Sequence, residues 1–336
     1  MDNSTLNSSV TDQNYTSEGN AELTFLHFTV AAAIAIVLCL IGIVGNSIVF
    51  WYLCFKIKRN KYTIYIINLS VADFIYLLFT IIVLMIHINT LSSPHPDFEG
   101  KDSLLKFLEI LSKSAQYSGM FILTAISLER CLSVLYPFWY QCNRPQNLSI
   151  IICAVLWLIG CSESLIDNLV CSEEAFMAQT RECTPVQIII FGISIVICLP
   201  IMVISSFTLL IKIKRTFREQ YPHKLYIIII VAVFVFVISV IPINCLWFLM
   251  YFKFLQSSMG TLGLYFASVY CLALNGTIDP YIYFIVGKKW KQKTSHSIQD
   301  VLERAFKTED DENDSKSNGT SNTSNTSSQT NLASTF

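Results

Sequence analysis

The chain has 336 residues and a net charge of −1; 53% of its residues are hydrophobic and only 14% are charged. A soluble domain usually carries about 25% charged residues, so this composition excludes an ordinary soluble protein and indicates an integral membrane protein. The eleven cysteines show no CxxC spacing, which argues against a metal-binding or redox protein.

Seven runs along the chain carry few or no charges, and each is long enough to cross a bilayer as a helix, which takes about 20 apolar residues. Backbone amides in hydrocarbon must pair within their own segment, so these runs must be helical. The runs cover approximately residues 28–55, 62–88, 104–135, 148–170, 186–211, 225–252 and 262–286. We therefore predict an all-α fold, a seven-transmembrane helix bundle over residues 28–286.

Lysine and arginine mark the cytoplasmic side of a membrane protein. No basic residue precedes Lys56, and the basic clusters then fall in alternate loops and after the seventh run. This pattern predicts a multi-pass plasma-membrane protein with an extracellular N-terminal segment, residues 1–27. Its sequons at Asn3, Asn7 and Asn14 predict N-linked glycosylation there.

Two segments follow the seventh run. Residues 287–306 are basic and amphipathic, which predicts a short cytoplasmic helix in contact with membrane lipid, the alternative being a solvated helix. Residues 307–336 are rich in Ser, Thr and Asn and poor in apolar residues, which predicts disorder. Phosphate on the twelve Ser and Thr residues from Ser315 onward would create a site for a basic partner surface, the alternative being an inert tail.

Polar groups inside the predicted spans mark candidate functional sites, because they are costly in lipid. Asn46, Asp73, Asn275 and Asp279 lie mid-span in the first, second and seventh runs and form one cluster if those helices are neighbours. Two carboxylates there cannot both stay charged without a cation or a donor. Either a sodium ion binds at Asp73 or one acid is protonated; the alternative is a static set of hydrogen bonds between helices.

The cytoplasmic end of the third run carries the adjacent pair Glu129 and Arg130, in which the acid is in position to hold the arginine at the membrane boundary. The alternative is an arginine that only anchors the helix. Pro200, Pro242 and Pro280 lie in the last three runs, where proline kinks a helix. Such kinks would provide hinges that couple the two sides of the membrane.

The motifs together resemble those of the rhodopsin-like G-protein-coupled receptors over residues 28–306. They are "GNSIVF" with Asn46, "NLSVADF" with Asp73, "ERC" at 129–131, Trp157, Pro200, Phe236 with Pro242, and "DPYIY" at 279–283. The segments "LTAISLERCLSVLYPFWYQCNRP", "KLYIIII", "YFIVGKKWKQK" and "VLERAF" narrow the resemblance to Mas and the Mas-related receptors.

The resemblance implies a receptor that binds an extracellular ligand and activates heterotrimeric G proteins. It implies coupling roles for Glu129, Arg130, Phe236, Pro280 and Tyr283. Leu105 stands where the superfamily usually has its helix-three cysteine, and the Mas-related pattern instead implies a disulfide between Cys171 and Cys183.

The resemblance also implies a ligand site at the outer end of the fourth span. Asp167 matches an acid that pairs with cationic ligands in some Mas-related members, and Glu163 lies one helical turn below it. A peptide or cationic ligand is therefore expected, the alternative being a surface acid without a ligand role. Gln187 replaces a second acid of some relatives, which weakens the case for a strongly dibasic ligand.

The alternatives to a signalling receptor are a transporter or channel, an enzyme, and a receptor that does not signal. An odd number of spans without similarly broken pairs argues against a transporter or channel. The sequence offers no converging nucleophiles or metal ligands, so we expect no enzyme and no metal beyond the possible sodium, and no nucleic-acid partner is expected. A scavenger or scaffold receptor that does not signal stays open, because coupling machinery does not establish its use.

Overall fold

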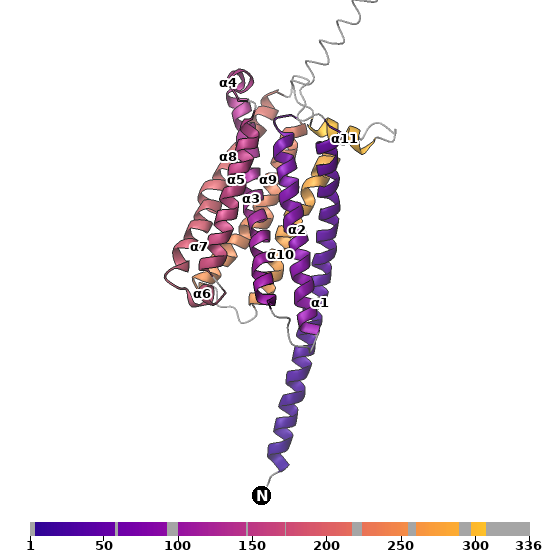
Figure 1. Cartoon of the computed structure of the whole chain (residues 1–336), viewed down its shortest axis with the longest axis vertical. Helices are drawn as coiled ribbons and strands as arrows, with labels where there is room; N and C mark the ends of the chain where they lie inside the picture. The colour runs from indigo at the N-terminus through magenta and orange to yellow at the C-terminus, as the bar shows by residue number, and fades with distance from the viewer. Residues whose placement is uncertain are drawn as a thin grey trace, which may run out of the picture.

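The computed structural model describes residues 4–57, 60–92, 100–145, 147–171, 173–216, 224–254, 260–288 and 297–306. Within these ranges every regular element is a helix (Figure 1). The α-helices are α1 (Ser4–Phe55), α2 (Thr63–Ser92), α3 (Lys101–Leu135), α4 (Pro137–Cys142), α5 (Leu148–Val170), α6 (Glu173–Ala178), α7 (Cys183–Gly192), α8 (Leu199–Thr216), α9 (Lys224–Tyr251), α10 (Gly260–Gly287) and α11 (Ile298–Phe306), and a π-helix, η1 (Ile193–Cys198), joins α7 to α8.

Seven of these stretches are long and apolar enough to cross a membrane, which confirms the predicted all-α seven-span bundle. α7, η1 and α8 together make one span, Cys183–Lys212. α1 runs without a break across the predicted boundary at residues 27 and 28, and its first part projects beyond the bundle (Figure 1). The helical segment therefore begins earlier than the apolar run.

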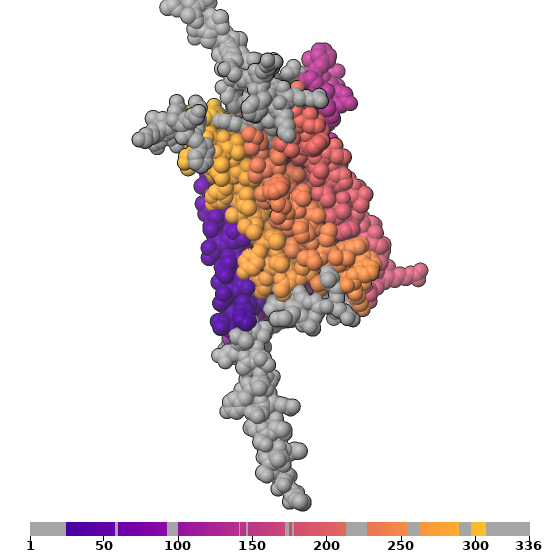
Figure 2. Space-filling model, turned by 180° about the vertical axis from the view of Figure 1, so that it is seen from behind, coloured from indigo at the N-terminus to yellow at the C-terminus, as the bar shows by residue number. Residues whose placement is uncertain are grey.

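The spans pack with α3 at the centre of the bundle. α3 contacts α2, α5, α8 and α9, while α10 contacts α1, α2 and α9. Figure 2 shows α1 beside α10 along the length of the bundle. α4 and α11 lie at one end and α6 lies at the other (Figure 1). We call the first the Arg130 end and the second, which holds the bond between Cys171 and Cys183, the disulfide end.

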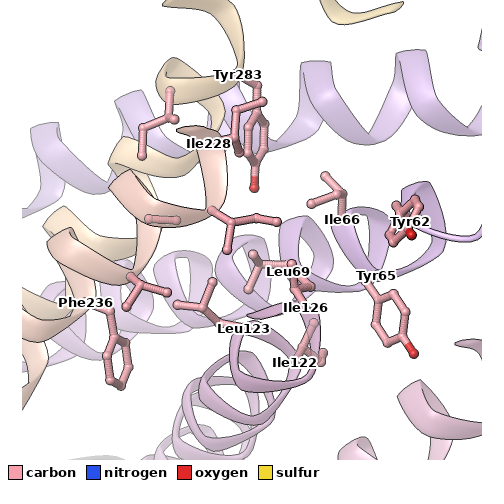
Figure 3. Close-up of a cluster of buried hydrophobic side chains, with 14 of the residues drawn as sticks. Tyr62, Tyr65, Ile66, Leu69, Ile122, Leu123, Ile126, Ile228, Phe236 and Tyr283 are labelled. Carbon is pink, nitrogen blue, oxygen red and sulfur yellow. The ribbon is translucent and has the colours of Figure 1, made fainter. Parts of the chain in front are cut away.

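Residues on the inward faces of four helices form the core of the bundle. Tyr65 and Leu69 of α2, Ile122 of α3, Phe236 of α9 and Tyr283 of α10 are all buried and belong to one hydrophobic cluster (Figure 3). Large apolar side chains also cover the outside of the spans. A soluble protein would not expose so many of them. Helices that are apolar on both their inward and their outward faces are expected in a bundle that is surrounded by lipid.

Glycines allow close contact between spans at specific points. A Cβ added at Gly160 of α5 would lie 2.7 Å from the backbone nitrogen and 3.0 Å from the Cα of Ser118 in α3. Ser118 is fully buried. The absence of a side chain at Gly160 is therefore what lets α3 and α5 approach this closely.

Proline accounts for the irregular part of the fifth span. Pro200 has no N–H to donate to the turn before it, and η1, with its wider π-helical turn, ends two residues before this proline. Pro242 and Pro280 lie inside α9 and α10, as the sequence places them.

The short helix α11 packs against the bundle at the Arg130 end. Leu302, Ala305 and Phe306 are buried, and the helix contacts α10, α9 and α1. The Phe306 ring meets the ring of Tyr283 edge-on with centroids 5.2 Å apart. The apolar face of this part of the predicted amphipathic helix therefore packs on protein, while residues 289–296 lie outside the described residues.

Candidate functional site

A disulfide bond joins the fourth and fifth spans at the disulfide end of the bundle. Cys171 follows the last residue of α5, and Cys183 is the first residue of α7. The two are bonded with a Cα–Cα distance of 5.0 Å, which confirms the predicted pair. The bond fixes the outer end of α5 against the start of the fifth span, and Asp167 lies one helical turn away from it.

Asp167 is buried at this end and already has several partners. Its Oδ2 lies 2.9 Å from Nζ of Lys113 on α3, and the hydroxyl of Tyr117 donates to the same oxygen at 3.4 Å. Nε2 of Gln187 on α7 donates to Oδ1 at 2.9 Å. Three spans therefore converge on one carboxylate, and the residue that replaces a second acid serves as a donor to the first.

The ion pair is open to water on one side only. The Lys113 side chain is 39% exposed, whereas that of Asp167 is 8% exposed. The lysine ammonium also donates to Oδ1 of Asn168 at 3.4 Å. The lysine side of the ion pair therefore borders water, whereas the carboxylate lies inside the bundle.

Glu163 lies one turn deeper on the same helix, also buried. Neither of its carboxylate oxygens has a hydrogen-bond partner among the described residues. Glu163 and Asp167 thus lie on the same face of α5, with Asp167 nearer the disulfide end and Glu163 deeper in the bundle, as their four-residue spacing predicts.

Glu129 sits in a dense polar network at the other end. Nη2 of Arg144 lies 2.7 Å from Oε1 and 2.8 Å from Oε2 of Glu129. The hydroxyls of Tyr65 and Tyr140 donate to the same carboxylate, each at 3.0 Å. The sequence pattern pointed only to the adjacent Arg130 as a partner for this acid, so Arg144 and the two tyrosines are new participants.

Arg130 is buried next to this network and stacks on an aromatic ring. Its guanidinium carbon lies 2.9 Å from the centroid of the Tyr62 ring, and that ring stacks on Tyr140 with centroids 6.0 Å apart. Tyr283, the other residue with an implied coupling role at this end, is covered by Phe306. Arg130 and Tyr283 therefore both face aromatic side chains.

The structure brings the predicted mid-span polar residues together. Nδ2 of Asn46 donates to the carbonyls of Gly42 and Gly276 at 3.0 and 2.8 Å. A Cβ added at Gly276 would lie 3.1 Å from Oδ1 of Asp73, so α2 and α10 touch at this glycine. Asp279 lies one turn further along α10 and is buried.

Several oxygens of this cluster have no hydrogen-bond partner among the described residues: Oδ1 of Asn46, Oδ2 of Asp73, Oδ1 of Asn275 and both carboxylate oxygens of Asp279. Orphaned buried oxygens from carboxylates and amides are the donor set that a hard cation takes. The residues present therefore fit the predicted sodium ion.

The predicted glycosylation sites and the predicted tail lie outside the part of the chain whose side chains the structure describes. Asn3 is outside the described residues, and the side chains of Asn7 and Asn14 in α1 are likewise not described. The Ser/Thr-rich segment 307–336 is also outside. Sequence reasoning missed Lys113 and Arg144 as site residues, although a lysine inside a span signals a buried partner.

These observations define a seven-transmembrane protein with an acidic site at one end and a buried arginine network at the other. A family model, the 7 transmembrane receptor (rhodopsin family), matches residues 45–283. The human protein named Proto-oncogene Mas is 37% identical to this chain over 80% of it and 81% of the relative.

Two further relatives belong to the same group. The Mas-related G-protein coupled receptor member D of Macaca fascicularis is 31% identical over 91% of this chain and 94% of the relative. The human Mas-related G-protein coupled receptor member X1 is 31% identical over 90% of each. The chain therefore belongs to the Mas and Mas-related receptors within the rhodopsin family of G-protein-coupled receptors. Membership implies G-protein signalling in response to an extracellular ligand, and it rules out the enzyme class.

Proposed function

We propose that this receptor responds to a peptide or small ligand with a cationic group, and that this group binds Asp167 at the disulfide end. The observation that carries the proposal is the pair of Lys113 and Asp167, because a half-exposed ammonium already occupies a buried carboxylate. The site therefore accepts a cation, and charge-assisted hydrogen bonds make such a contact strong. Glu163, one turn deeper, offers a second acid to a longer cationic group.

The disulfide end faces outward in this proposal, and the Arg130 end faces the cytoplasm. Three observations support this orientation: the basic loops, the projection of α1 from the disulfide end (Figure 1), and the disulfide itself, which forms in oxidising compartments. The receptor then lies in the plasma membrane, with glycans on Asn3, Asn7 and Asn14.

The proposed mechanism is a shift between two states of the bundle. A ligand acts only through its differential affinity for these states, so binding at Asp167 must favour an arrangement in which α9 moves away at the Arg130 end. That movement would uncover Arg130 and Tyr283 for a G-protein α subunit. Inside the spans, α10 would change its bend at Pro280 and α9 would repack around Phe236. A receptor kinase and arrestin would act on the tail, residues 307–336.

We expect Lys113→Met to increase the sensitivity of the receptor to cationic agonists. The lysine competes with the ligand for Asp167, and a partly exposed ion pair contributes about 0.2–1 kcal/mol. Loss of this competitor should lower the half-maximal concentration by up to about fivefold. The measurement is calcium and cyclic AMP in cells expressing the receptor, screened with cationic peptides and amines beside their uncharged analogues.

Lys106→Met is the matched control, because it removes an exposed lysine from the same helix, seven residues before Lys113. Responses confined to uncharged or acidic compounds would refute the proposed ligand class. A receptor that binds cationic compounds but recruits no G protein would instead support the scavenger or scaffold alternative.

We also propose that a sodium ion binds between Asp73 and Asp279. The buried oxygens without partners support this, since an ion would satisfy them and offset the repulsion of two acids. Purified receptor should unfold at a higher temperature in sodium chloride than in choline chloride of equal strength, and Asp73→Asn should remove the difference. Equal unfolding temperatures for the unaltered receptor in both salts would instead favour a protonated acid.

A further inference from the structure

Arg144 is a fully buried cation in the connection between α4 and α5. Its side chain is 0% exposed, although it lies outside the spans. Besides its two contacts with Glu129, Nη2 donates to Oγ of Ser149 at 2.6 Å, and that hydroxyl donates to the carbonyl of Lys61 at 2.8 Å. One guanidinium thus joins the ends of α3 and α5 to the loop that precedes α2.

The charge states in this network favour the bonded arrangement. Burial lowers the pKa of Arg144, but the hydrogen bond and charge of Glu129 outweigh it and raise the pKa above its ordinary value. Burial, together with nearby Tyr62 and Glu129, raises the pKa of Tyr140. The arginine therefore stays charged and the tyrosine stays protonated, so both donate to the Glu129 carboxylate.

The network holds one face of α4 and leaves the other face open. Tyr140 is buried and bonded to Glu129, and Arg144 follows the end of α4 by two residues. On the opposite face Phe138 is 78% exposed and Trp139 is 43% exposed. The short helix is too small to be stable alone, so its position depends on these anchors.

We propose that Arg144 is a positioning residue for G-protein coupling: as the counter-ion of Glu129 it fixes α4 on the bundle, so that Phe138 and Trp139 are held in one place at the Arg130 end. The proposal rests on the proposed function for its orientation, in which the Arg130 end meets the G protein. The anchoring itself rests on the contacts of Arg144 with Glu129 and Ser149. Removal of Arg144 would leave a buried carboxylate without this cation, which is unfavourable.

The anchoring can be measured without a ligand or a G protein. Cys142, the last residue of α4, is exposed, whereas the other free cysteines of the described residues are buried or only partly exposed. A nitroxide label on Cys142 of the purified full-length receptor therefore reports the mobility of α4, with Cys142→Ser as the labelling control. We expect a restrained label in the unaltered receptor and a predominantly mobile label in R144M.

Three further variants separate anchoring from general damage. R144K keeps the charge but not the planar guanidinium, so it should give an intermediate spectrum. E129Q should free the label, and the double variant E129Q/R144M should be no more mobile than R144M, because both changes break the same contact. If R144M does not fold, R144K and E129Q carry the test.

An unchanged spectrum in R144M, or in R144K and E129Q when R144M does not fold, would overturn the anchoring role. So would effects of E129Q and R144M that simply add. Neither outcome depends on the ligand, and failure of the ligand proposal would leave these spectra unchanged. The consequence for coupling is measured separately, as G-protein recruitment per receptor at the cell surface, which should fall in R144M in proportion to label mobility. Full recruitment by a receptor with a mobile label would overturn the coupling role.

Discussion

Gly160→Val is expected to remove most of the folded receptor from the cell surface. The new side chain would lie within 3.0 Å of backbone atoms of Ser118, and neither helix can yield without opening the contact between α3 and α5. Overpacking of a tight interior site costs about 1–3 kcal/mol, and each 1.4 kcal/mol is about a tenfold change in an equilibrium. We expect a loss of about tenfold in surface staining and in monodisperse receptor after solubilisation.

Gly192→Val is the matched control for this change. Gly192 lies in the helical fifth span, and a Cβ there would meet no atom within 4 Å. Both substitutions place the same β-branched residue in a helix, so only the contact with α3 differs. Equal surface levels for the two variants would contradict the close packing of α3 and α5.

Asp167→Ala is expected to remove the response to cationic agonists. Loss of one partner from a desolvated charge pair costs about 2–5 kcal/mol, so the half-maximal concentration should rise by about 30-fold or more. The fold should survive, because Lys113 is 39% exposed and its ammonium can turn to water. The measurement is a concentration–response curve for calcium or cyclic AMP at matched surface expression.

Asp102→Ala provides the comparison, since it removes an exposed acid from the first turn of α3 at the same end. It should leave the curve in place. A curve that shifts equally in both variants would indicate a general effect of surface charge, and an unshifted curve for Asp167→Ala would place the cationic group elsewhere.

The sequence was sufficient for the features that depend on local pattern. The lengths of the apolar runs predicted seven spans, and motif spacing placed Asn46, Asp73 and Asp279 on helices that do come together around Gly276. The disulfide and the family followed from the resemblance, and both are confirmed. Each of these features is encoded within one segment or by a family pattern.

The sequence pattern did not predict contacts between segments that are distant along the chain. Glu129 and Arg144 are separated by a helix and a turn, and nothing local indicates that the arginine folds back to the acid. Lys113 is a charge near the start of the third span, and its contact with Asp167 depends on how α3 and α5 rotate against each other, which the pattern of either helix alone does not show. The same holds for α11, whose amphipathic pattern predicts a covered face but not what covers it.

The proposed roles of Asp167 and Arg130 require that the disulfide end lies outside the cell and the Arg130 end lies inside. Epitope tags at the two termini of the full-length receptor measure this directly by antibody staining of intact and permeabilised cells. We expect the N-terminal tag to stain on intact cells and the C-terminal tag to stain only after permeabilisation. Staining of both tags on intact cells would contradict the seven-span topology, and with it the link between Asp167 and Arg130.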